Sequence, residues 1–256
     1  MLVITVSNQK GGVGKTTTCV NLAAELGRRR YATLVVDIDP QANSTSGLGI
    51  APGSVETSIY DVLLGEAAVA ESVVRTRWEG VSLLPSTIDL AGAEIELASA
   101  MSRETKLRRQ LEALKGYDVA IVDCPPSLGL LTINGLVAAD RLIIPIQCEY
   151  YALEGVSQLA RTVALVNENL NPRLAIDGIL LTMFDARTRL SAEVADEVRR
   201  QFGDRVFTAV IPRNVRLSEA PSHGAPICYY DPTSSGAHAY EELGKEVSDR
   251  WLRRAR

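Results

Sequence analysis

The chain has 256 residues, of which 46% are hydrophobic and 23% charged. This composition is ordinary for a globular protein and excludes a disordered or collagen-like chain. The net charge is −4, so any contact with nucleic acid must come from a local basic patch. The length predicts one substantial domain over 1–256.

Cysteine usage and the amino terminus exclude further classes. The four cysteines are Cys19, Cys124, Cys148 and Cys228. They form no C-x-x-C pair, which favours buried thiols over a zinc site or a disulfide framework. The first residues lack the basic start and long apolar middle of a signal peptide. Because no apolar run reaches the ~20 residues of a membrane-spanning helix, we expect a cytoplasmic protein.

Short apolar runs alternate with longer segments of helical character. The runs are nearly continuous in Val, Ile and Leu, as is typical of strands buried on both faces of a parallel sheet. The predicted strands are 2–6, 33–36, 81–84, 118–122, 142–146, 179–182 and 206–211. The predicted helices are 15–30, 89–97, 103–114, 129–139, 154–169, 191–202 and 238–254. The alternation predicts a doubly wound α/β fold with a mostly parallel sheet, helices on both faces and a ligand site at the carboxyl ends of the strands.

A glycine-rich loop follows the first predicted strand and opens the first predicted helix. Its glycines, which let successive backbone N–H groups form an anion-binding nest, are Gly11, Gly12 and Gly14. Lys15 is placed to reach the β- and γ-phosphates of a nucleotide, and the Thr16 hydroxyl is placed to ligate Mg²⁺. Thr17 would reach the α-phosphate region. The strand–loop–helix context therefore predicts a P-loop.

The start of this loop departs from the general pattern G-x-x-x-x-G-K-[ST]. Gln9 stands where the first glycine is expected, and Lys10 follows it. A second lysine is not needed to hold phosphates within one subunit. Spacing alone leaves open whether Lys10 has a function or is simply exposed.

Carboxylates end two of the predicted strands. Asp37 and Asp39 follow the second strand, and strand alternation predicts that they lie on the same side. One carboxylate near a γ-phosphate can orient a water for in-line attack, while a turn or helix-cap role stays open for one of the two. Asp123 ends a further apolar run, a Walker B arrangement that aims a carboxylate at Mg²⁺.

The loop resembles the deviant Walker A motif of the ParA/MinD ATPases, and among these the short ParA (Soj) group of chromosome-partitioning proteins. The motifs that carry the resemblance are Lys10-Gly11-Gly12-Val13-Gly14-Lys15-Thr16-Thr17, Asp37-Ile38-Asp39-Pro40-Gln41, Asp123-Cys124-Pro125-Pro126, the segment 149–155, and Ile211-Pro212-Arg213-Asn214-Val215-Arg216. Several motifs in the same order run through nearly the whole chain.

The resemblance implies roles for individual residues. Lys10 would be the signature lysine that crosses a dimer interface, and Asp39 the residue that orients the water. Together with Lys15 these two form the implied catalytic set. The loop from Lys10 to Thr17, including Val13, would bind ATP. Thr16, Asp37 and Asp123 would serve the Mg²⁺ ion. The residues implied around adenine are Met183, Pro212 and Asn214.

The resemblance also implies partners. An ATP-sandwich homodimer would bind nonspecific double-stranded DNA on the nucleoid through Arg187 and Arg216. A ParB-type centromere-binding partner would stimulate a hydrolysis that is slow without it. The carboxyl end is too poor in apolar residues for a MinD-like membrane helix, and no helix-turn-helix domain is expected.

Other interpretations stay open. The chain could be a nucleotide-dependent regulator of replication or division with incidental hydrolysis, or a metabolic P-loop kinase, although no phosphoacceptor motif supports the latter. The basic cluster at the carboxyl end is Arg250, Arg253, Arg254 and Arg256. It could be a solvated helix end that complements the helix dipole, or a phosphate contact.

Overall fold

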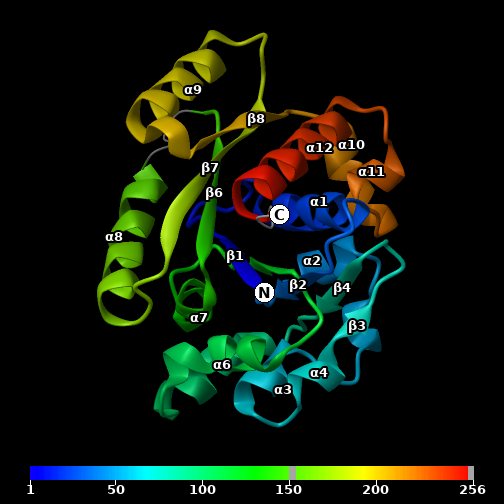
Figure 1. Cartoon of the computed structure of the whole chain (residues 1–256), viewed down its shortest axis with the longest axis vertical. Helices are drawn as coiled ribbons and strands as arrows, with labels where there is room; N and C mark the ends of the chain where they lie inside the picture. The colour runs from blue at the N-terminus through cyan, green and yellow to red at the C-terminus, as the bar shows by residue number, and fades with distance from the viewer. Residues whose placement is uncertain (150–153, 253–256) are drawn as a thin grey trace.

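One eight-stranded sheet runs through the molecule, with the first strand near its centre (Figure 1). The computed structural model describes residues 1–149 and 154–252. The strand order is β3-β4-β2-β5-β1-β6-β7-β8, and only β3 pairs antiparallel within it. The strands are β1 (Leu2–Val6), β2 (Thr33–Asp37), β3 (Val74–Arg75), β4 (Val81–Leu84), β5 (Val119–Asp123), β6 (Arg141–Gln147), β7 (Ala175–Phe184) and β8 (Val206–Pro212).

Helices cover both faces of the sheet (Figure 1). They are α1 (Lys15–Arg28), α2 (Asn43–Gly47), α3 (Ile59–Leu64), α4 (Val69–Ser72), α5 (Leu90–Glu96), α6 (Lys106–Ala113), α7 (Leu130–Ala138), α8 (Glu154–Asn169), α9 (Arg189–Phe202), α10 (Val215–Glu219), α11 (Ile227–Tyr230) and α12 (Ser235–Val247). Apolar side chains of α1 and α12 form one core with the sheet. Those of α3, α5, α6 and α7, and those of α7, α8 and α9, form two further cores.

The predicted doubly wound α/β fold is confirmed, and all the predicted strands form. The central strands β2 and β5 are buried along their whole length, as continuous apolar runs predict. The sequence missed β3, which is too short for any periodic signal. It also missed the early start of β7, where Asp177 interrupts the apolar run although the segment still pairs with β6.

The last predicted helix begins earlier than residue 238. The Ser234 hydroxyl accepts a hydrogen bond from the Ala237 N–H and so caps α12 at its start. The helix continues as a π-helical turn over Ser248–Leu252, and the predicted end at 254 lies outside the described residues. The four cysteines are free and buried, as their spacing predicts. Within 1–149 and 154–252, no helix has the length and apolarity to cross a membrane.

Three central strands end at the same level of the sheet. Val6 of β1 pairs with Asp123 of β5, and Asp123 pairs in turn with Asp37 of β2. Because these strands are parallel, the glycine-rich loop after β1 and both carboxylates come together at one edge.

Candidate functional site

The glycine-rich loop connects β1 to α1. Gly12 and Gly14 have φ values of 73° and 89°, in the left-handed region that side chains rarely adopt, so the turns need glycine. Since α1 begins at Lys15, the free N–H groups of its first turn face the loop. A phosphate cavity of about 300 Å³ lies here, lined by Gly11, Gly12, Gly14, Lys15, Thr16, Thr17, Asp39, Gln41, Asn43, Pro126 and Met183.

Buried hydrogen bonds hold the loop against the neighbouring strands. The Thr182 hydroxyl, at the end of β7, donates to the Val13 carbonyl at 2.9 Å. The Asn8 amide donates to the Pro145 carbonyl in β6 at 2.7 Å, and its Oδ1 accepts the Lys10 N–H at 3.0 Å. Val13 thus supports the loop through its carbonyl and its buried side chain, and does not line the cavity.

The two lysines of the loop lie differently. The Lys15 ammonium lies in the cavity wall and donates to the Lys10 carbonyl at 3.2 Å. Burial lowers the pKa of Lys15, and the negative charge of Asp123 opposes that shift. The Lys10 side chain is half-buried and does not line the phosphate cavity of its own chain. An incoming phosphate would therefore meet Lys15 and the loop N–H groups first.

The two aspartates after β2 do not share one environment. Asp39 lines the phosphate cavity, and its Oδ1 accepts the Gln41 N–H at 3.0 Å. Asp37 is fully buried and does not line it. Its Oδ1 accepts the Asp39 N–H, while its Oδ2 accepts both the N–H and the hydroxyl of Thr45 at 2.8 Å. Asp37 thus anchors α2 behind the cavity, and its role at the metal stays a prediction.

Asp123 offers the carboxylate best suited to a cation. Its Oδ2 accepts the Ser44 hydroxyl at 2.7 Å. Its buried Oδ1 accepts no hydrogen bond from the residues that the structure describes. Burial raises the pKa of Asp123, and the hydrogen bond from Ser44 opposes that shift. This buried carboxylate oxygen without a hydrogen-bond donor is the kind of oxygen ligand that Mg²⁺ prefers.

A second cavity, of about 310 Å³, continues from the phosphate cavity. Both cavities share the wall formed by Gly14, Thr17 and Met183. The second contains all three residues predicted around a base, Met183, Pro212 and Asn214. The lining residues that the sequence did not indicate are Thr182, Ile211, Arg213, Leu217, Ser218, Pro221 and Tyr240. They come from β7, from β8 and the loop after it, from α10 and the 3-10 turn that follows, and from α12. Only Ile211 and Arg213 belong to a motif that the sequence analysis quoted.

Met183 and Asn214, which line this second cavity, are each held in place by local structure. Met183 has φ of 51°, which strains a residue with a side chain by roughly 1–2 kcal/mol. The Asn214 Oδ1 accepts the Arg216 N–H at the start of α10, and its amide donates to Ser235 at 2.8 Å. Asn214 therefore joins α10 to α12 as well as lining the cavity.

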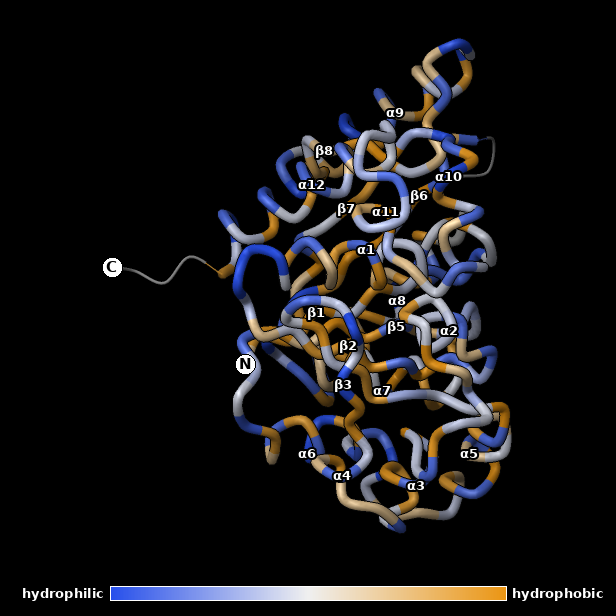
Figure 2. Tube along the Cα trace, turned by 90° about the vertical axis from the view of Figure 1, so that its right-hand side faces the viewer, coloured by the Kyte–Doolittle hydropathy of each residue, from blue (hydrophilic) through white to orange (hydrophobic). Residues whose placement is uncertain are grey.

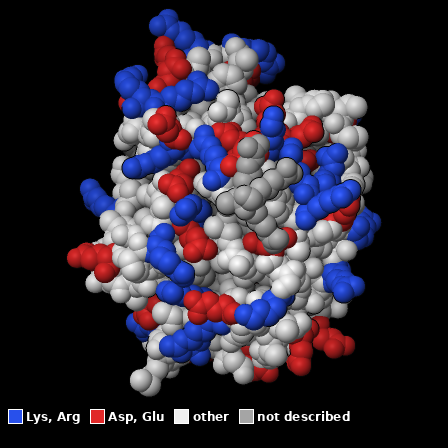
Figure 3. Space-filling view, viewed as in Figure 1, with Lys and Arg blue, Asp and Glu red and all other residues white. Residues whose placement is uncertain are grey.

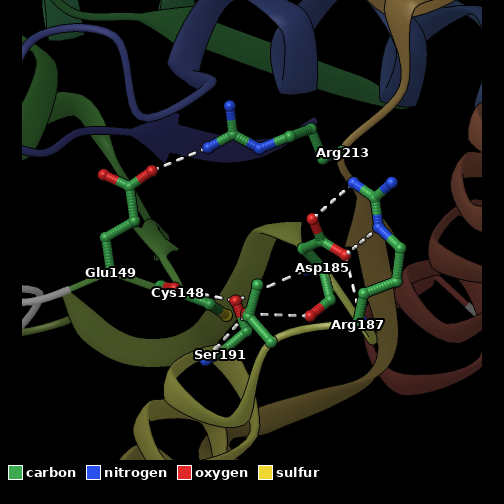
Figure 4. Close-up of polar contacts among 7 residues, drawn as sticks. Cys148, Glu149, Asp185, Arg187, Ser191 and Arg213 are labelled. Atoms are coloured by element: carbon green, nitrogen blue, oxygen red, sulfur yellow. Dashed lines mark hydrogen bonds and ion pairs between the residues drawn. The ribbon is translucent and has the colours of Figure 1, made fainter.

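Of the predicted DNA-binding arginines, Arg187 lies on the loop after β7, and Arg216 lies in α10, which follows the adjacent strand β8. Arg187 makes a two-point ion pair with Asp185, at 2.9 and 2.7 Å (Figure 4). Arg216 pairs with Glu219 at 2.8 Å and with Asp231 at 3.3 Å. The sequence did not single out Arg213, which lies between them and pairs with Glu149 at 2.7 Å (Figure 4). All three cations are thus paired within the chain.

Elsewhere the surface charges are mixed. On the face shown in Figure 3, basic and acidic side chains alternate without a large area of one sign. Arg250 of the basic carboxyl-terminal cluster lies over the Phe207 ring, pairs with Glu246 and donates to the Asp204 and Val206 carbonyls. This residue therefore has a structural role, which favours the helix-end interpretation for it. The other arginines of the cluster lie outside the described residues.

Comparison with known proteins places the chain in a family. The family model described as an AAA domain matches residues 1–176. The sporulation initiation inhibitor protein Soj of Bacillus subtilis is 58% identical over 96% of this chain and 98% of its own length. The chromosome partitioning protein ParA of Myxococcus xanthus is 52% identical over 97% and 88%. The chain belongs to the ParA/MinD family.

The chain is also similar to a solved structure that holds a nucleotide analog. It is described as cobyrinic acid a,c-diamide synthase from Mycobacterium smegmatis, with bound ATP analog and magnesium. It is 41% identical, covers 98% of this chain and 96% of its own, and has a TM-score of 0.87. The predicted membership, together with its short ParA and Soj relatives, is therefore confirmed.

Proposed function

We propose that this ParA/MinD protein is a Mg²⁺- and ATP-dependent DNA-partitioning ATPase. The observation that carries the proposal is the pair of cavities that meet at Met183, one under the glycine-rich loop and one beyond it. The first suits a triphosphate and the second suits a base. The names of the Soj and ParA relatives support the partitioning role.

Different residues at the phosphate cavity bind the phosphates, hold Mg²⁺ and orient the attacking water. Loop N–H groups and Lys15 bind the phosphates, and Thr16 and Asp123 hold Mg²⁺, with Asp37 predicted behind them. A Mg²⁺ ion held there would neutralise charge on the phosphate oxygens. Asp39 orients a water for in-line attack on the γ-phosphate. Turnover is slow because no arginine lines the phosphate cavity among the described residues.

Lys10 acts between subunits. Its side chain stays out of its own phosphate cavity, so it is free to reach the nucleotide of a second copy in a two-fold homodimer. ATP then stabilises the dimer through contacts of its γ-phosphate with both subunits. Hydrolysis removes those contacts and releases monomers.

The dimer would bind nonspecific double-stranded DNA through Arg187 and Arg216. Two weak patches become one surface when the subunits pair, which raises affinity without new contacts. The protein would therefore be cytoplasmic and nucleoid-associated while ATP is bound. A ParB-type centromere-binding partner would stimulate hydrolysis and release it.

Co-sedimentation with DNA tests the switch. We expect the protein to pellet with DNA in ATP and to stay in solution in ADP or without nucleotide. Equal binding in all three conditions would instead indicate a passive binder. Arg187→Glu combined with Arg216→Glu should abolish pelleting and keep ATP bound.

Light scattering with ATP tests the role of Lys10. We expect Lys10→Ala to bind ATP as a monomer. The control is Lys115→Ala, which changes an exposed lysine near the opposite edge of the sheet and should still dimerise. Asp39→Ala should accumulate as an ATP-bound dimer without phosphate release. A dimeric Lys10→Ala protein would remove the intersubunit role.

A further inference from the structure

The backbone of Asp39 is held at both of its polar groups. Its N–H donates to Asp37 Oδ1 at 3.2 Å. Its carbonyl accepts the Ala42 N–H at 2.9 Å and the Ser86 hydroxyl at 2.8 Å. Asp37 and Ala42 belong to the same stretch of chain as Asp39, whereas Ser86 follows β4, 47 residues further along. Ser86 therefore ties the loop that carries Asp39 to a second strand of the sheet.

The segment that carries Ser86 has little freedom to move. β4 pairs with β2 up to Leu84. The next carbonyl, that of Pro85, accepts the Ile59 N–H at 2.8 Å, at the start of α3. The Ser86 hydroxyl also lies 3.5 Å from the Thr87 carbonyl. This longer contact is a weak hydrogen bond, so the bond at 2.8 Å is the one that the hydroxyl makes.

Thr45 in α2 closes these contacts into a ring of hydrogen bonds. Its hydroxyl accepts the Ser86 N–H at 3.0 Å and donates to Asp37 Oδ2 at 2.8 Å. Asp37, in turn, accepts the Asp39 N–H. Asp37, Thr45 and Ser86 are fully buried, and hydrogen bonds are electrostatically stronger away from water. Figure 2 shows α2, and α5, the next helix after Ser86, on the side of the molecule away from the amino terminus.

The ring fixes the direction in which the Asp39 side chain leaves the backbone. Asp39 lines the phosphate cavity, and because its Oδ1 accepts the Gln41 N–H, Oδ2 is the oxygen left for a water. Both peptide groups beside the Asp39 Cα are anchored, so the carboxylate can turn only about its own side-chain bonds. A displacement of about 1 Å at a reacting group can slow a reaction about 100-fold.

We propose that Ser86 is a positioning residue for ATP hydrolysis. Its hydroxyl holds the Asp39 peptide so that the carboxylate meets the water that attacks the γ-phosphate. Ser86 itself does not line the phosphate cavity, so its removal should leave ATP binding unchanged. This inference rests on the proposed ATPase, and it adds to that function the group that fixes the residue orienting the water.

Single-turnover hydrolysis by Ser86→Ala tests this role, because it measures the chemical step apart from product release. We expect the rate to fall about tenfold and the Kd for ATP to stay within about twofold of the wild type. Ser86→Cys keeps nearly the same shape and has a weaker hydrogen-bond donor. Its rate should lie between those of Ser86→Ala and the wild type.

Ser72→Ala is the matched control. Ser72 is also buried, and its hydroxyl also donates to a backbone carbonyl, that of Ala68 at the start of α4, at 3.1 Å. The two alanine variants should melt at similar temperatures, and Ser72→Ala should hydrolyse ATP at the wild-type rate. An unchanged rate in Ser86→Ala, or an equal loss in both variants, would overturn the inference while the wild type stays active. A wild-type protein that hydrolyses no ATP would instead refute the proposed function, and this role with it.

Discussion

The Thr182 side chain in β7 holds the glycine-rich loop by one hydrogen bond, and Thr182→Val removes that hydrogen bond alone. Valine keeps the shape of the side chain and the contacts of its methyl group, and removes the 2.9 Å hydrogen bond to the Val13 carbonyl. Both residues are about 1% exposed, so the carbonyl loses its partner in a dry environment. An unsatisfied buried acceptor costs about 1–3 kcal/mol. For a chain of this length, that lowers Tm by about 2–10 °C.

The same change should weaken nucleotide binding, because the glycine-rich loop must then be ordered by the ligand. We expect the Kd for ATP to rise about threefold to tenfold by calorimetry. The matched control is Thr33→Val, another buried strand threonine, whose hydroxyl donates to the Tyr31 carbonyl at 3.0 Å, away from the cavities. It should lower Tm and leave the Kd unchanged. If Thr182→Val melts with the wild type and binds ATP equally well, the hydrogen bond does not hold the loop.

Three more predictions concern packing, DNA and the thiols. Gly27→Ala places a Cβ 2.1 Å from the Glu79 carbonyl oxygen, so urea denaturation should show a loss of about 2 kcal/mol or more. Gly92→Ala, whose added Cβ meets only the flexible Glu96 carboxylate at 3.4 Å, should gain up to about 1 kcal/mol, and a loss there would contradict the packing argument. Asp185→Asn removes the carboxylate that pairs with Arg187, so anisotropy should show up to about fivefold tighter DNA binding; weaker binding would make Asp185 a positioning residue. Ellman's reagent should label the buried cysteines only after unfolding, and rapid native labelling would disprove their burial.

The sequence predicted the sheet and the phosphate loop because both carry strong local signals. The apolar runs that became β2 and β5 are buried along their whole length, and Gly12 and Gly14 do adopt the left-handed turns that a phosphate loop needs. Register then brought Asp123 to the level of the loop. These features depend on residues that are close in the chain or on one repeated pattern.

Other parts could not be predicted because distant residues decide them. Alternation placed Asp37 on the same side as Asp39, but the folding of α2 brings the Thr45 hydroxyl to the Asp37 carboxylate, and Asp37 does not line the cavity. The residues predicted around a base came from family resemblance alone, since Tyr240 and Met183 meet only in the folded chain. The helix predicted over 89–97 carried no indication of its orientation, and only the packing of α5 shows that Leu90 and Ala93 are buried while Ile95 is exposed.

Met183, whose backbone is strained, lies where two cavities built by different parts of the chain meet. The phosphate cavity is built mainly from residues before 130, whereas the neighbouring cavity takes its walls mainly from residues after 180. The phosphates of a bound nucleotide would therefore contact mainly residues before 130, and its base would contact mainly residues after 180. Mutation could alter which base the protein accepts and leave the hydrolytic machinery intact, so a chimera exchanging the late part between relatives should inherit its donor's nucleotide preference.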